Sequence, residues 1–113
     1  MNFVKRFLFG PTYGLDKHSI EYKITQHLQQ IKTYISQKEQ NQAFSKTAFR
    51  HEFTEIQKEY AQIIEKYPLI KDQLALTLNS MHGWFSEKQT AKKVKLNITQ
   101  TQDLLRELSR NKN

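Results

Sequence analysis

The chain has 113 residues, of which 37% are hydrophobic and 26% are charged, and its formal net charge is +7. This length suffices for one hydrophobic core, which predicts a single domain over residues 1–113. The lack of cysteine excludes disulfides, thiolate metal sites and a cysteine nucleophile. A pI of about 9.7 favours polyanionic partners (nucleic acid, an anionic membrane surface or an acidic protein) or serves solubility alone.

The sequence contains no apolar run of the roughly 18 residues that a membrane-spanning helix needs. Its N-terminus also lacks the apolar core of a secretory signal. We therefore expect a cytoplasmic protein, with a peripheral position at the inner face of the membrane as an alternative. Only three glycines and two prolines leave few places for turns, which predicts few and long helices.

Residues 1–14 form an aromatic and basic segment that differs from the rest of the chain. The stretch FVKRFLFGPTYG surrounds a Lys-Arg pair with phenylalanines and is followed by residues that let the chain reverse. Three roles are open: capping the helical body, docking on a partner protein, or lying in a membrane interface where the basic residues meet anionic lipid. The turn-forming residues favour capping. The candidate contact residues in this segment are Phe3, Lys5, Arg6, Phe7 and Phe9.

A first long helix is predicted over residues 16–39, with Asp16 as its N-cap. Apolar side chains recur there every three or four residues, which is the repeat of one helix face. This stripe consists of Ile20, Ile24, Leu28, Ile31 and Ile35. Tyr22 lies nearly opposite, on a face rich in glutamine and almost uncharged. We predict that Tyr22 and this face contact a partner.

A second helix is expected to begin at Ser45 or Thr47 and to end at Tyr67, because Pro68 disfavours the helical conformation in the residue before it. Its aromatic stripe is interpreted as core, since bundle cores use such residues for their large buried area. That stripe is Phe49, Phe53, Ile56, Tyr60, Ile63 and Tyr67.

Acidic residues on the second helix are interpreted as a solvated face. Glu52, Glu55 and Glu59 follow helical spacing, and His51 is four residues before Glu55. A di-metal centre would also need Glu-x-x-His pairs on facing helices, and the sequence contains none. Two possible ligands on one helix are weak evidence for a metal, so we predict no metal site.

Gly83 leaves the number of helices open. The third helix is predicted to start at Pro68, and it either ends at Gly83 or continues through it at a cost of about 1 kcal/mol relative to alanine. In the first case Ser86 to Gln89 would form a capping box for a fourth helix. We favour the break, which predicts an all-α antiparallel bundle of four helices; a continuous helix would leave three. Residues 111–113 are expected to be a frayed tail.

The apolar stripes of the last two helices complete the expected core. They are Ile70, Leu74, Leu78, Met81 and Phe85 on the third, and Ala91, Val94, Ile98, Thr101, Leu105 and Leu108 on the fourth. We predict that the central residues of the stripes are buried, namely Phe53, Ile56, Leu74, Leu78, Ile98 and Leu105. Trp84 either closes the end of this core or stands exposed as an anchor for a partner.

A basic ridge runs along the last helix beside its apolar stripe. Its members fall within roughly 60° of one another on a helical wheel, and they are Lys88, Lys92, Lys95, Arg106 and Arg110. The ridge can follow a polyanion, pair with the acidic residues of the second helix, or remain an ordinary hydrated face. It is mostly lysine with few aromatic residues nearby, which argues against reading of nucleic-acid bases.

The sequence contains none of the catalytic motifs that we sought, neither G-x-S-x-G, nor a glycine-rich phosphate loop, nor H-E-x-x-H. We therefore predict a non-enzymatic protein without a cofactor or small-molecule substrate. Its predicted partner is a macromolecule, in the first place another protein, in an adaptor, regulatory or immunity-type role. The alternative is binding of nucleic acid or an anionic membrane surface through the basic ridge.

Overall fold

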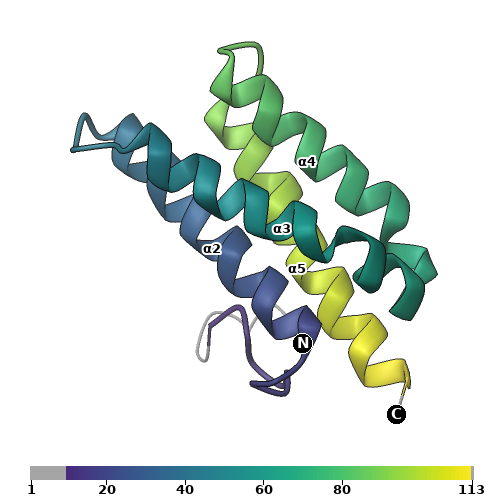
Figure 1. Cartoon of the computed structure of the whole chain (residues 1–113). Helices are drawn as coiled ribbons and strands as arrows, with labels where there is room; N and C mark the ends of the chain where they lie inside the picture. Colours follow the sequence, from purple (N-terminus) through teal and green to yellow (C-terminus); the bar gives the residue numbers. More distant parts are fainter. Residues whose placement is uncertain (1–9, 113) are drawn as a thin grey trace.

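The computed structural model describes residues 10–112 and forms an all-α bundle of four antiparallel helices (Figure 1). The helices are α2 (Ile20–Glu39), α3 (Lys46–Lys66), α4 (Lys71–Phe85) and α5 (Ala91–Lys112), with a short 3-10 helix, η1 (Pro68–Ile70), before α4. No strand occurs in the described part of the chain. Helix α2 packs against α3 and α5, and α4 packs against α5. The candidate contact residues Phe3, Lys5, Arg6, Phe7 and Phe9 lie outside the described residues.

Helix α2 begins later than expected, because Ser19 rather than Asp16 is its N-cap. The Ser19 hydroxyl oxygen accepts a hydrogen bond from the backbone N–H of Tyr22 over 3.1 Å. Asp16 instead stabilises the turn before the helix, where its carboxylate accepts from the His18 N–H over 2.9 Å. A capping side chain that is already used in a turn cannot serve the helix, so the prediction of Asp16 as the cap was wrong.

Helix α3 is capped by Ser45, one of the two residues proposed, and its hydroxyl accepts from the Ala48 N–H over 3.1 Å. The helix ends at Lys66, directly before Tyr67 and Pro68, as the steric restriction on a residue before proline requires. The chain becomes helical again at Pro68, but its first turn is the 3-10 helix η1 rather than α-helix.

The four-helix alternative is confirmed, although Gly83 is not where the helix breaks. Helix α4 continues through Gly83 to Phe85, and the Ser86 hydroxyl donates to the carbonyl oxygens of His82 and Gly83. The proposed capping box that begins at Ser86 was therefore wrong. Thr90 caps α5 instead, since its hydroxyl accepts from the Lys93 N–H over 3.3 Å.

At its other end, α5 extends to Lys112, so the helix includes two of the three residues expected in a frayed tail.

The apolar stripes of all four helices meet in one core. Of the six residues predicted to be buried there, four are buried, namely Ile56, Leu74, Ile98 and Leu105. Phe53 and Leu78 are only half-buried, which corrects the prediction. The reason is tertiary, because these two side chains line a cleft between α3 and α4 instead of the closed interior.

Candidate binding surfaces

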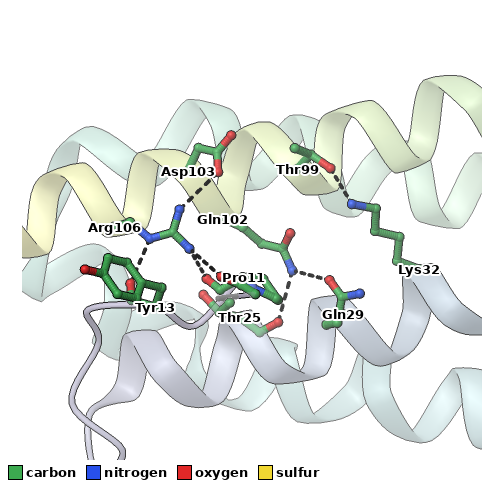
Figure 2. A network of polar contacts seen from close by, with 10 residues as sticks. Pro11, Tyr13, Thr25, Gln29, Lys32, Thr99, Gln102, Asp103 and Arg106 are labelled. Atoms are coloured by element: carbon green, nitrogen blue, oxygen red, sulfur yellow. Dashed lines mark hydrogen bonds and ion pairs between the residues drawn. The ribbon is translucent and has the colours of Figure 1, made fainter. Parts of the chain in front are cut away.

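The loop before α2 is held against α5 by Arg106. Figure 2 shows the guanidinium directed at the backbone of this loop. Its Nε donates to the carbonyl oxygen of Tyr13 over 2.9 Å, and Nη2 donates to the carbonyls of Gly10, over 3.4 Å, and Pro11. Asp103 lies 3.5 Å from Nη1. The residue is only 3% exposed, so its charge serves the attachment of the loop.

This burial corrects the predicted basic ridge. Arg106 lies beside the apolar stripe of α5, and the loop covers it, so it does not belong to an exposed surface. Lys88, Lys92 and Arg110 are exposed, and Lys95 is half-buried. A helical wheel gives only angles around one helix, and it does not show what another segment covers.

A cleft between α2 and α5 collects three lysines from the two helices. Lys32 of α2 faces Lys92 and Lys95 of α5 across a volume of about 650 Å³. The Lys32 ammonium donates to the Thr99 hydroxyl over 2.6 Å, as Figure 2 shows. The remaining residues that line this cleft are Ser36, Glu39 and Leu96. Sequence reasoning missed Lys32, because no pattern within α2 indicates which part of α5 it faces.

One alternative for the basic ridge was pairing with the acidic residues of the second helix. Lys95 does not form such a pair. This ammonium pairs with Glu39 on α2 and lies 3.4 Å from the Ser36 hydroxyl. On α3, Glu52 contacts His27 of α2, and Glu55 lies 3.5 Å from Lys58 on its own helix. Glu52 is thus engaged with α2, and Glu55 is engaged within α3.

A second cleft, between α3 and α4, is lined mainly by apolar and neutral polar side chains. A volume of about 430 Å³ is bounded by Phe53, Gln57, Tyr60, Ala75, Leu78, Asn79 and His82. It adjoins a smaller one of about 200 Å³, lined by Phe49, Arg50, Phe53, His82 and Phe85. The Arg50 guanidinium carbon lies 4.9 Å from the centre of the Phe85 ring. Of the aromatic stripe residues that line the two cavities, Phe53, Tyr60 and Phe85 are half-buried, although their spacing predicts core.

Trp84 closes one end of the core, which is the first of the two roles considered for it. It is 9% exposed and packs edge-on to Phe44, with 5.7 Å between the ring centres. Phe49 lies 5.2 Å away, and the Lys38 ammonium lies 5.2 Å from the indole centre. This position does not suit an exposed anchor, which corrects the prediction that Trp84 contacts a partner.

Tyr22 remains a candidate contact. Its side chain is half-buried, and its hydroxyl accepts a hydrogen bond from the amide of Gln26 over 3.0 Å. The interaction lies within α2, so it leaves the role of this face as a prediction.

A buried carboxylate links α2 to the end of α3. Glu21 receives a hydrogen bond from the hydroxyl of Tyr67, and its other oxygen lies 2.9 Å from the Lys66 ammonium. Burial raises the pKa of Glu21, but the hydrogen bonds from Tyr67 and Lys66 outweigh burial and hold its pKa below the ordinary value. The hydrogen bond to Glu21 raises the pKa of Lys66, and burial raises that of Tyr67. The three groups are therefore a structural link that favours the ionised carboxylate.

Within residues 10–112, no cluster of three or more histidine, aspartate or glutamate side chains could hold a metal ion. None of the helices in this part of the chain combines the length and the apolar character needed to cross a membrane. Family models, characterised proteins and solved structures were compared with the chain, and none of them matches.

Proposed function

We propose that this chain is a non-enzymatic binding protein whose partner is another protein. The partner docks an amphipathic helix with acidic flanks in the cleft between α3 and α4. The observation that carries the proposal is the half-exposure of aromatic and aliphatic stripe residues in that cleft, whereas their equivalents elsewhere on the same stripes are buried.

The shape of the cleft supports a helical occupant. Phe53 and Tyr60 are two turns apart on α3, and Leu78 and His82 are one turn apart on α4, so the lining follows both helix axes. A groove between two helices fits a third helix whose anchors recur every three or four residues. Aromatic residues such as Phe85 in the adjoining cavity are the type enriched in interface cores.

Charge supports an acidic partner. The described residues that line the two cavities include Arg50 and His82 but no carboxylate. Arg50 is exposed at one end of the cleft, and the whole chain carries a net charge of +7. A carboxylate on the incoming helix would pair with Arg50, and the overall charge would steer an acidic protein toward this one.

Photo-crosslinking in the source cell tests the proposal. A benzophenone amino acid replaces Asn79 in the cleft or, as a control, Gln62, which is exposed on α3 and does not line the cleft. We expect an adduct from position 79 alone, mapped to an apolar helix of one protein with acidic flanking residues. Arg50→Glu should weaken that adduct, whereas Lys58→Glu, the same reversal outside the cleft, should leave it unchanged.

Three results would refute docking in this cleft. They are equal adducts from both positions, no adduct from position 79, and an adduct that maps to a segment without an apolar helical face.

A further inference from the structure

We propose that the face formed by α2 and α5 binds anionic lipid membranes. The surface consists of Lys32, Lys92 and Lys95 around Leu96, together with Gly10, the first residue that the structure describes. It is separate from the cleft between α3 and α4, because α2 packs on α3, α4 packs on α5, and none of the described residues lines both clefts. The inference therefore does not rest on the proposed protein partner.

The lysines give this face its attraction to anions. Among the described residues, Lys32, Lys92 and Lys95 line one cleft with a single carboxylate, that of Glu39, which pairs with Lys95. Lys93, next to Lys92, is also exposed. Flexible ammonium groups suit the phosphates of a lipid surface, where each lysine adds attraction without needing a fixed geometry.

Leu96 distinguishes a membrane from nucleic acid as the ligand. Its side chain is 55% exposed although it lies among the lysines of the cleft. An apolar side chain flanked by lysines can enter the interface between headgroups and acyl chains. The described residues that line this cleft include no aromatic ring for base stacking and no arginine for bidentate contacts to bases.

Arg106 holds Gly10, the first described residue, on the face formed by α2 and α5. Arg106 follows Thr99 by seven residues on α5, which is two helical turns or about 10 Å along the axis. Figure 2 shows Thr99, Gln102 and Arg106 along the side of α5 that faces α2, with the loop of Pro11 and Tyr13 at Arg106. The hydrogen bonds from Arg106 hold Gly10 and Pro11 there.

The sequence that precedes Gly10 supplies a second membrane signal. Residues 1–9 contain three phenylalanines together with Lys5 and Arg6, the residue types that favour a headgroup interface. They join the described chain at the loop held by Arg106. Stable membrane attachment generally takes two signals, and here the aromatic segment directly precedes in sequence the loop that Arg106 holds beside the basic cleft.

Vesicle sedimentation with the full chain tests the inference. The probes are vesicles of phosphatidylcholine alone and of phosphatidylcholine mixed with phosphatidylglycerol. We expect binding to the mixed vesicles, which salt weakens, and little binding to the neutral ones. Lys92→Gln should weaken binding by about fivefold, and Leu96→Ala by about tenfold. The matched controls Lys71→Gln and Leu76→Ala change exposed residues on α4 and should leave binding unchanged.

Two further measurements identify other ligands and other surfaces. The first is binding of a mixed-sequence DNA duplex, and the second is vesicle binding by Phe3→Ser/Phe7→Ser. Nucleic acid replaces membrane as the ligand if DNA binds, if Lys92→Gln weakens it and if vesicles do not bind. The role of the cleft in membrane binding is refuted if the phenylalanine variant abolishes vesicle binding while Lys92→Gln and Leu96→Ala behave like their controls. Equal binding to both vesicle types also overturns the inference.

Discussion

Arg106 on α5 donates a hydrogen bond through Nε to the carbonyl oxygen of Tyr13, 93 residues earlier in the chain. This contact, together with those to Gly10 and Pro11, attaches an irregular loop to the bundle through polar bonds, in addition to the buried side chain of Leu15 in the same loop. An irregular loop depends on such bonds, because its carbonyl groups must be satisfied when they are covered.

The loop contact predicts a large effect of substitution at Arg106. Arg106→Met retains much of the buried stem but removes the guanidinium donor from the three carbonyl groups. We expect the free energy of unfolding to fall by about 1.5 to 3 kcal/mol in urea titrations, the range for hydrogen bonds to a charged group. Lys93→Met, on the exposed side of α5, is the control and should change it by less than about 0.5 kcal/mol. Equal losses in the two variants would mean that Arg106 does not hold the loop.

Leu74 and Leu76 give a matched pair for the core. Leu74 is fully buried, whereas Leu76 is 49% exposed two residues later on the same helix. Leu74→Ala should lower the free energy of unfolding by about 2 to 5 kcal/mol because it leaves a cavity. Leu76→Ala should cost less than about 0.5 kcal/mol. Chemical denaturation measures both, and a loss below about 1 kcal/mol at Leu74 would contradict its place in the core.

Glu21 predicts how stability depends on pH. Its pKa lies below the ordinary value of 4.5, so the folded state binds the proton less readily than the unfolded state does. The stabilisation from this group is therefore complete above pH 4.5, and it is lost as the pH falls through the lower pKa of the folded state. Glu21→Gln should remove part of the acid-induced loss, whereas Glu65→Gln, at an exposed position on α3, should retain it. Thermal melts measured across the acidic pH range test this prediction. An identical dependence of the melting temperature on pH in the two variants would contradict it.

Gly83 predicts a stabilising double substitution. It lies within α4, where alanine is favoured over glycine by about 1 kcal/mol. An added Cβ would lie 2.5 Å from Cγ of Gln89, which must then move. Gly83→Ala alone should therefore gain less than it does in the background of Gln89→Ala, where about 1 kcal/mol is expected. Urea titrations of the wild type, the two single variants and the double variant give the coupling free energy between the two positions. An equal gain in both backgrounds would exclude the clash.

Local signals predicted most of the fold. The stripes of α2 and α3 anticipated Ile24, Ile56 and Ile63 as core residues, and Pro68 marked the junction before α4. Capping was less predictable, because Asp16 and Ser19 are equally good cap types and only the turn between them decides which is used. The same holds for Ser86 and Thr90 at the start of α5.

The candidate surfaces were predictable only in part. Lys92 and Lys95 stood out as basic residues of one helix, but Lys32 joins them from α2, and Arg106 is covered by the loop of Tyr13. The cleft that leaves Phe53 half-buried depends on the spacing between α3 and α4. Contacts between residues far apart in the chain have no local signature.

The sequence by itself determined the helices, because the apolar repeat and the breaks at proline depend on neighbours within a few residues. It also determined the positive charge of the chain, which is a sum over residues and independent of the fold. Only the tertiary structure decided which basic residues are exposed and which stripe residues line a cleft. These properties depend on how the helices pack, and Arg106 is buried because a loop 93 residues earlier in the chain folds over it.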